Sequence, residues 1–173
     1  MYPAVLTAQS TEKKVAELSD LVSSALYRDI LEFQSLKNPA ILTKLLKILA
    51  LQIGQEVSLH ALGQTLSLDG RTVERYIDLL EKSYVIYRIP PYFTNKKKEI
   101  IKTQKIYFYD LGIRNALLGN FTPLDSRTDV GQMWENWLFS ERIKHLRYQH
   151  SLTSFHFWRG TNQQEIDLVE ENA

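Results

Sequence analysis

The chain has 173 residues and no cysteine, with 44% hydrophobic residues, 24% charged residues and a net charge of +1 at pH 7. This composition is typical of a globular protein and excludes a disulfide framework, a thiolate zinc site and a disordered or fibrous chain. No apolar run approaches the roughly 18 residues of a membrane span. We therefore expect a cytoplasmic protein with no membrane partner, in which any attraction to nucleic acid depends on local charge.

The first 38 residues are expected to form a linker followed by one long amphipathic helix. Residues 1–11 are interpreted as the linker. From Glu12 to Phe33, apolar residues recur at helical spacing, so one face of this helix is expected to be buried.

The middle of the chain carries the pattern of a helix-turn-helix followed by two strands. Pro39 begins one helix, and Ser58 and Asp69 can cap two short helices, because their side chains accept hydrogen bonds from free backbone amides. The β-branched and aromatic runs at 84–89 and 99–110 are predicted to be strands on either side of a basic loop. This order predicts a winged helix-turn-helix.

The second short helix and the basic loop hold the candidate nucleic-acid contacts, because such a helix starts in the major groove while flanking groups hold phosphates. The candidates are Arg71, Thr72, Arg75, Lys96, Lys97 and Lys98. Four apolar residues of the helix are predicted to face the core: Val73, Tyr76, Ile77 and Leu80. Glu74 and Asp78 share the exposed face and would repel phosphates. DNA contact and a purely structural or protein-docking role therefore both stay open.

The last third of the chain is predicted to contain two helices and a hairpin. Asp110 can cap a short helix that Gly119 ends. The helix at 132–147 is expected to supply the core with Met133, Trp134, Trp137, Leu138 and Leu146. The runs 154–159 and 164–170 are predicted to pair as a hairpin.

Three acidic residues of this region form the candidate metal site. Alternation along a strand places Glu165 and Asp167 on one face, and Glu135 is expected to lie close to Asp167. Converging carboxylates are what a magnesium-dependent phosphodiester cleavage site needs, because the metal holds the scissile oxygens and activates water. The alternative interpretation is an acidic edge that faces solvent.

The sequence resembles a widespread family of bacterial and archaeal AAA-type ATPases, from about Tyr2 to Val169. The most specific phrases are LLEKSYVIYRIPPYF at 79–93 and KIYFYDLGIRNALL at 105–118. Members of that family carry an N-terminal ATPase module and a C-terminal region of unassigned function. The resemblance implies an α+β fold in three parts: a linker and long helix at 1–38, a winged helix-turn-helix at 39–110, and a truncated domain at 111–173 that is similar to the restriction-endonuclease-like PD-(D/E)xK nucleases.

The same resemblance assigns roles to individual residues. Glu135 matches the acidic residue of the first nuclease-like helix, and Asp167 matches the acid of the second core strand. The family continues into another strand with a Glu-x-Lys-like step, which this sequence does not reach before Ala173. The metal site is therefore expected to be incomplete and the chain inactive in cleavage. Arg28 matches a Tyr-Arg-Asp step and is a candidate contact to the ATPase module.

The sequence contains no G-x-x-x-x-G-K-[ST] phosphate loop. ATP and Mg²⁺ are thus expected in the parent protein and no cofactor in this chain. The first hypothesis is a non-catalytic region through which an AAA-type ATPase engages DNA or a protein partner, with its own ATPase module as a further partner. The alternatives are a divalent-metal nuclease completed in the full-length protein and a free-standing winged-helix regulator.

Overall fold

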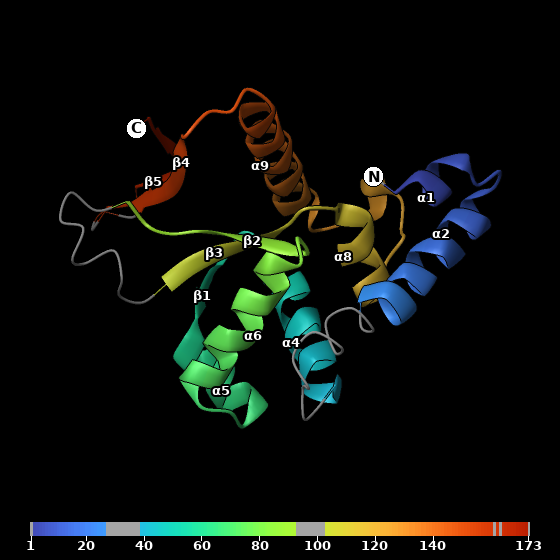
Figure 1. Cartoon of the computed structure of the whole chain (residues 1–173), viewed down its shortest axis with the longest axis horizontal. Helices are drawn as coiled ribbons and strands as arrows, with labels where there is room; N and C mark the ends of the chain where they lie inside the picture. The colour runs from blue at the N-terminus through green and yellow to red at the C-terminus, as the bar shows by residue number, and fades with distance from the viewer. Residues whose placement is uncertain (1, 27–38, 93–102, 161, 163, 173) are drawn as a thin grey trace.

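Helices and two small antiparallel sheets make up the chain, which has an α+β fold (Figure 1). The computed structural model describes residues 2–26, 39–92, 103–160, 162 and 164–172. In chain order the elements are α1 Pro3–Thr7, α2 Thr11–Asp20, the π-helical η1 Leu21–Leu26, α4 Pro39–Leu51, β1 Glu56–Ser58, α5 Leu59–Leu66, α6 Gly70–Lys82, β2 Ile86–Ile89, β3 Thr103–Phe108, α8 Leu111–Leu118, the 3-10 turn η2 Leu124–Ser126, α9 Val130–Tyr148, β4 Ser154–Arg159 and β5 Glu165–Glu171. No helix among the described residues has the length and apolar character needed to span a membrane.

The interpretation of residues 1–11 as a linker is wrong in part, because α1 lies within them. Pro3 opens this helix, where its fixed φ fits the first turn and its missing N–H costs no hydrogen bond. Val5 is buried, so even this short helix contributes to the core.

The helix predicted from Glu12 begins one residue earlier, as α2. Ser10 caps it by accepting a hydrogen bond from Lys13 N over 3.3 Å. At Leu21 the α-helix changes to the π-helical η1. Residues 27–33 of the predicted long helix lie outside the described residues.

The two short helices predicted in the middle of the chain are confirmed, together with their caps. Ser58 accepts a hydrogen bond from Ala61 N at the start of α5, and Asp69 accepts one from Thr72 N at the start of α6. The preceding strand β1 was not predicted, because it has only three residues and finds its partner, β3, far along the chain.

The remaining caps predicted from the sequence are confirmed at α8. Asp110 accepts hydrogen bonds from Gly112 N over 2.7 Å and from Ile113 N over 3.3 Å. Gly119 ends the helix with a φ of 61°, a left-handed conformation that glycine adopts without steric cost.

The central strand of the larger sheet is β3, which pairs antiparallel with β1 and β2. In Figure 1, α4, α5 and α6 lie on one side of this sheet and α9 lies on the other. The rings of Tyr107 on β3 and Phe139 on α9 are 5.3 Å apart, so Tyr107 faces α9. Because side chains alternate along a strand, Lys105 points to the same side as Tyr107.

The buried face of α9 agrees with the prediction at Leu146 and differs from it at Trp134, Trp137 and Leu138. Its buried residues are Asn136, Phe139, Ser140, Ile143 and Leu146. Trp134, Trp137 and Leu138 are instead 61%, 45% and 47% exposed, so their assignment to the core is wrong. The reason is Asn136, whose amide accepts a hydrogen bond from Phe108 N over 2.7 Å and donates one to Phe108 O over 2.8 Å. This polar residue sets the buried face.

The predicted C-terminal hairpin is confirmed as β4 and β5. It is attached to the segment after β2, since Phe157 N donates to Pro90 O over 3.0 Å and Tyr92 N donates to Phe157 O over 2.6 Å. The hairpin therefore lies next to the larger sheet. The predicted division of the chain at 38/39 and 110/111 stays a prediction.

Candidate functional site

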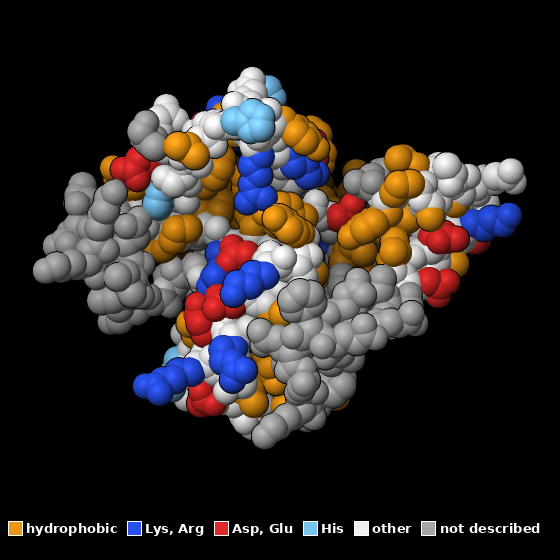
Figure 2. All heavy atoms as spheres, viewed as in Figure 1, with side chains coloured by type: hydrophobic (Ala, Val, Ile, Leu, Met, Phe, Trp, Pro, Cys, Tyr) orange, Lys and Arg blue, Asp and Glu red, His pale blue; other side chains and the backbone are white. Residues whose placement is uncertain are grey.

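The outer face of α6 carries two exposed arginines, Arg71 and Arg75, one helical turn apart. Val73, Tyr76, Ile77 and Leu80 are buried on the opposite face, as the spacing predicted. Basic and acidic side chains lie together over α6 in the space-filling view (Figure 2). A hollow of about 470 Å³ beside the start of this helix is lined by Leu59, His60, Gly70, Arg71 and Glu74.

The acidic residues of α6 are bound by Arg88 of β2. Its guanidinium lies 2.7 Å from Glu74 Oε1 and 2.7 Å from Asp78 Oδ1. Arg88 Nε also donates to Glu81 Oε2 over 2.7 Å. Both carboxylates that were expected to repel phosphates are therefore paired with a cation within the fold, although this one guanidinium is shared by three acids.

The other predicted nucleic-acid contacts differ in placement. Thr72 is half-buried and committed to the helix cap, because its Oγ1 donates to Asp69 Oδ2 over 2.6 Å. Lys96, Lys97 and Lys98 lie outside the described residues, as does Arg28, the candidate contact to an ATPase module. Of the predicted contacts that the structure describes, Arg71 and Arg75 are therefore the two whose side chains are exposed.

A second candidate site lies where the larger sheet, α9 and the β4–β5 hairpin meet. Its pocket of about 460 Å³ is lined by Gly54, Gln55, Glu56, Lys105, Gln132, Glu135, Arg159, Glu165 and Asp167. Lys105 Nζ lies 2.6 Å from Glu165 Oε1 and 2.9 Å from Asp167 Oδ1. Its distance to Glu135 Oε1 is 3.7 Å. Since the Lys105 side chain is only 4% exposed, three carboxylates converge on a buried ammonium.

The predicted proximity of Glu135 and Asp167 is confirmed. Both contact the same Lys105 Nζ, so the two oxygens are at most 6.6 Å apart, the sum of 3.7 and 2.9 Å. Glu165 and Asp167 also share one face of β5, as the alternation predicted, because both reach the same ammonium.

Glu135 lines this pocket from α9, and its side chain is 23% exposed. Tyr107 donates a hydrogen bond from its hydroxyl to Glu135 Oε1. Burial raises the pKa of Glu135, and the neighbouring carboxylates of Asp167 and Glu165 raise it further, although Tyr107 and Lys105 oppose the shift. Gly54 lies next to this carboxylate with a φ of 74°, a left-handed conformation that glycine adopts without steric cost.

Glu165 has the opposite electrostatic environment. Its hydrogen bond from Lys105 lowers its pKa, and the bond from Arg159 adds to this effect. Arg159 NH2 donates to Glu165 Oε2 over 2.8 Å, and NH1 donates to Glu56 Oε1 over 2.5 Å. The pocket is therefore an ion network that joins β1, β3, β4, β5 and α9.

The residues present do not fit the Mg²⁺ that the resemblance implies at Glu135 and Asp167. Magnesium needs carboxylate oxygens directed at one vacant position, at roughly 2.1 Å. Here the ammonium of Lys105 takes that position. Among the residues that the structure describes, no group of three or more histidine, aspartate or glutamate side chains is arranged to hold a metal ion.

Lys105, Tyr107, Arg159 and Glu56 were missed as site residues by the sequence analysis. Lys105 appeared there only as the first residue of the run at 105–118. The signal that could have identified it is the run KIYFY at 105–109, because a lysine that alternates with aromatic residues in a buried strand points inward and needs acidic partners. The partners themselves come from elements far along the chain, and no local pattern names them.

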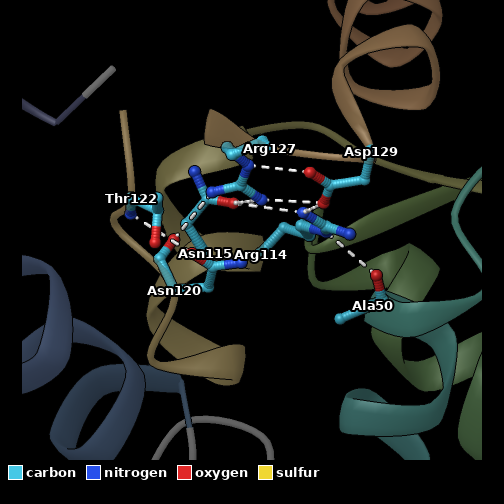
Figure 3. A network of polar contacts seen from close by, with 7 residues as sticks. All are labelled: Ala50, Arg114, Asn115, Asn120, Thr122, Arg127 and Asp129. Carbon is cyan, nitrogen blue, oxygen red and sulfur yellow. Dashed lines mark hydrogen bonds and ion pairs between the residues drawn. The ribbon is translucent and has the colours of Figure 1, made fainter. Parts of the chain in front are cut away.

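A third polar network lies in the segment that leads into α9 (Figure 3). Asp129 accepts hydrogen bonds from Arg114 NH1 over 2.5 Å and from Arg127 Nε over 2.7 Å. The side chains of both arginines are at most 3% exposed. Arg114 Nε also donates to Ala50 O over 2.9 Å, which ties α8 to the C-terminal end of α4. The arginines lower the pKa of Asp129, the hydrogen bond from Arg127 most of all.

Comparisons with known proteins identify relatives but no activity. Residues 1–124 match the family model described as Domain of unknown function (DUF8612), and residues 130–173 match the one described as Domain of unknown function (DUF4143). An uncharacterized protein of Mycobacterium tuberculosis is 28% identical over 171 residues, which cover 98% of this chain and 38% of that protein. No solved structure is significantly similar to the chain.

Two further relatives come from distant organisms. An uncharacterized protein of Haemophilus influenzae is 27% identical over 148 residues, which cover 83% of this chain and 36% of that protein. One from Methanocaldococcus jannaschii is 31% identical over 99 residues, which cover 56% of this chain and 21% of that protein. The chain therefore spans well under half the length of these relatives.

Proposed function

The chain belongs to the family described as domain of unknown function DUF8612, and we propose that it acts as a non-catalytic DNA-binding region. The observation that carries this proposal is the charge on α6: Arg71 and Arg75 are exposed, while Arg88 binds the neighbouring acids. A helix that presents arginines and keeps its own carboxylates paired can approach phosphates without strong repulsion.

The arrangement of residues 39–110 supports a winged helix-turn-helix as the binding module. The helices α4, α5 and α6 are combined with an antiparallel sheet of order β1–β3–β2. In such a module α6 would enter the major groove, and the loop between β2 and β3 would lie beside the DNA backbone. Lys96, Lys97 and Lys98 belong to that loop and would add contacts to phosphates that carry no sequence information.

We also propose that the region is the C-terminal part of an AAA-type ATPase. The resemblance given above supports this, and so does the length of the relatives, of which this chain matches 38% or less. ATP and Mg²⁺ would then be bound by the ATPase module, with Arg28 as a contact to it. Residues 111–173 would form a domain similar to the PD-(D/E)xK nucleases.

The test is binding to a short, fluorescein-labelled DNA duplex of random sequence, followed by fluorescence anisotropy across a range of salt concentrations. The double variant R71Q/R75Q is expected to bind about tenfold more weakly, because two phosphate contacts are lost. The slope of log affinity against log salt concentration is expected to fall by about 2 for the same reason.

The matched control is K13Q/K14Q, which removes two positive charges from the exposed face of α2. This variant is expected to bind like the wild type, because α2 is not part of the proposed module. If both double variants lower DNA affinity equally, the loss comes from the change in net charge and not from the position of the arginines on α6. Absence of salt-dependent binding in the wild type would overturn the proposal and favour docking of a protein on α6.

Metal-dependent cleavage, the alternative function, would need Mg²⁺ between Glu135 and Asp167, where Lys105 lies. We therefore propose no cleavage by this chain. Nicking of supercoiled plasmid in the presence of Mg²⁺, and its loss in E135Q, would contradict that statement.

A further inference from the structure

The ion network around Lys105 differs from a metal site in the identity of its cation. Its ammonium donates to Asp167 over 2.9 Å and lies 2.6 Å from Glu165 Oε1, with Glu135 on the third side. We propose that the Lys105 ammonium is the resident cation of this pocket, that it excludes divalent metal from the wild-type chain, and that removal of this lysine creates a metal site. The inference does not depend on DNA binding.

Backbone pairing fixes the position of Lys105. This residue is paired with Glu56 of β1 on one side of β3 and with Ile89 of β2 on the other. The ammonium also lies 5.5 Å from the centre of the Phe157 ring, within the range of a cation–π contact. The side chain is therefore held from the sheet, the hairpin and α9 at once, and it cannot leave without disrupting packing.

The ammonium also keeps its charge at neutral pH. Its Nζ lies 2.6 Å from Glu165 Oε1 and 2.9 Å from Asp167 Oδ1, and hydrogen bonds to carboxylates at these distances favour the charged form of a lysine. A divalent ion entering the wild-type pocket would meet this positive charge within the range of a hydrogen bond. Repulsion between the two cations therefore excludes the metal.

Without Lys105 the pocket has what Mg²⁺ or Mn²⁺ requires. Arg159 would still pair with Glu165 and Glu56, which leaves Glu135 and Asp167 without a cation. Their oxygens are at most 6.6 Å apart, the sum of 3.7 and 2.9 Å. Magnesium binds through one or two carboxylates and keeps several waters, so at this separation one carboxylate can bind the ion directly and the other through a bound water.

The experiment is a calorimetric titration of the chain with MnCl₂, using the wild type, K105A, K105R and K47A. Lys47 is an exposed lysine on α4, so K47A removes the same charge far from the pocket. K105A is expected to bind one Mn²⁺ at least about tenfold more tightly than the wild type, because the carboxylates become free. The wild type, K47A and K105R, which keeps a cation, are expected to show no saturable binding below millimolar Mn²⁺.

Results of two kinds would overturn the proposal. One is saturable Mn²⁺ binding by the wild type that E135Q or D167N abolishes. The other is a folded K105A that binds no more Mn²⁺ than the wild type, or a K105R that binds as tightly as K105A.

Loss of folding in K105A is also informative. Recovery of the far-ultraviolet circular dichroism of K105A on addition of Mn²⁺ would support the proposal, because the metal then replaces the missing cation. If K105A stays unfolded with Mn²⁺, the titration is made on K105A/E165Q, which removes one charge of each sign. One bound Mn²⁺ would support the proposal, and a folded variant without binding would overturn it.

Discussion

Two regions of the molecule use the same charges, one cation and three carboxylates, in different ways. Around Arg88 the three acids all lie on α6, and they remain between 32% and 40% exposed. Around Lys105 the acids come from α9 and β5, and the cation is buried. The first network changes the charge of a surface, and the second joins parts of the chain that are far apart in sequence.

The difference teaches that burial and sequence separation, and not the number of charges, decide what an ion network does. A network whose acids all lie on one helix and stay partly exposed contributes little to stability, because water screens these acids and the helix forms without the network. A buried cation shared by distant elements contributes more, because the removal of one partner leaves charges that water cannot reach. The four predictions below test this contrast through the stability of variants, in addition to the DNA and metal titrations above.

The largest effect on stability is expected for K105A. Loss of the ammonium leaves Glu135 and Asp167 without a cation, while Arg159 still pairs with Glu165, and we expect the free energy of unfolding to fall by about 3 kcal/mol. This is the lower end of the usual range for a broken buried pair, because Asp167 is 56% exposed and water partly solvates it. Urea unfolding followed by circular dichroism measures the change.

The control for K105A is again K47A, which is expected to lie within about 0.5 kcal/mol of the wild type. A loss of less than about 1 kcal/mol in K105A would place the Lys105 network in the class of surface ion pairs. The contrast drawn with Arg88 would then be wrong.

The next effect is expected for D129N, at the network between the two matched family regions. Arg114 and Arg127 are buried and share this carboxylate, so we expect a loss of about 2 kcal/mol at pH 7. Because the pKa of Asp129 is lowered in the folded state, its stabilisation is present above the unfolded pKa of about 3.9 and is lost as the pH falls through the lower folded value.

Acid unfolding tests the D129N prediction. The penalty of the variant relative to the wild type is expected to stay constant above pH of about 5 and to shrink below about 3.9. A penalty independent of pH down to the lowest accessible value would show that packing, and not the charge of Asp129, causes the loss.

Local signals in the sequence predicted where helices begin. The prediction of buried residues was wrong where a contact with a distant part of the chain determines the buried face. Ser58, Asp69 and Asp110 identified three helix starts, because a cap is made within a few residues of the chain. The buried face of α9 was misassigned to Trp134 and Trp137. Its determinant is the hydrogen bonding of an asparagine to the backbone of β3, which no periodicity of apolar residues reveals.

The same limit holds for the candidate site: contacts within one strand were predictable, and partners from distant elements were not. Alternation along one strand correctly joined Glu165 and Asp167, and the expected proximity to Glu135 holds. Lys105 could not be assigned to them, because it reaches them only through the pairing of the sheet with the hairpin. The same limit applies to Arg88, since the charge of α6 depends on a residue of β2.

A smaller effect is expected from a comparison of E165Q with E135Q. The pKa of Glu165 is lowered, so its charged form stabilises the fold, whereas burial raises the pKa of Glu135 and makes its charged form costly. We expect E165Q to be less stable than E135Q by about 1 kcal/mol at pH 7. The measurement is the urea midpoint at a series of pH values.

The pH dependence of the two variants has opposite sign. The contribution of Glu165 is present above its unfolded pKa of about 4.3 and is lost as the pH falls through the lower folded value. Glu135 binds its proton more tightly in the folded state, so its protonation stabilises the fold as the pH falls toward its raised folded pKa. The gap between the variants is therefore expected to shrink in acid, and a gap that widens would contradict the assignment.

The smallest effect on stability, below about 1 kcal/mol, is expected for R88Q, because its partners stay solvated after the change. The same variant is expected to change DNA affinity more clearly than it changes stability. With Arg88 gone, Glu74 and Asp78 lose their counter-charge and repel phosphates more strongly, so affinity is expected to fall several-fold. The salt slope should change little, because Arg71 and Arg75 still make their own phosphate contacts.

The triple variant R88Q/E74Q/D78N should recover affinity, since it removes the two repelling carboxylates together with the cation. If R88Q binds DNA as tightly as the wild type in the anisotropy assay, the acids of α6 do not face the DNA, and the proposed approach of this helix is wrong.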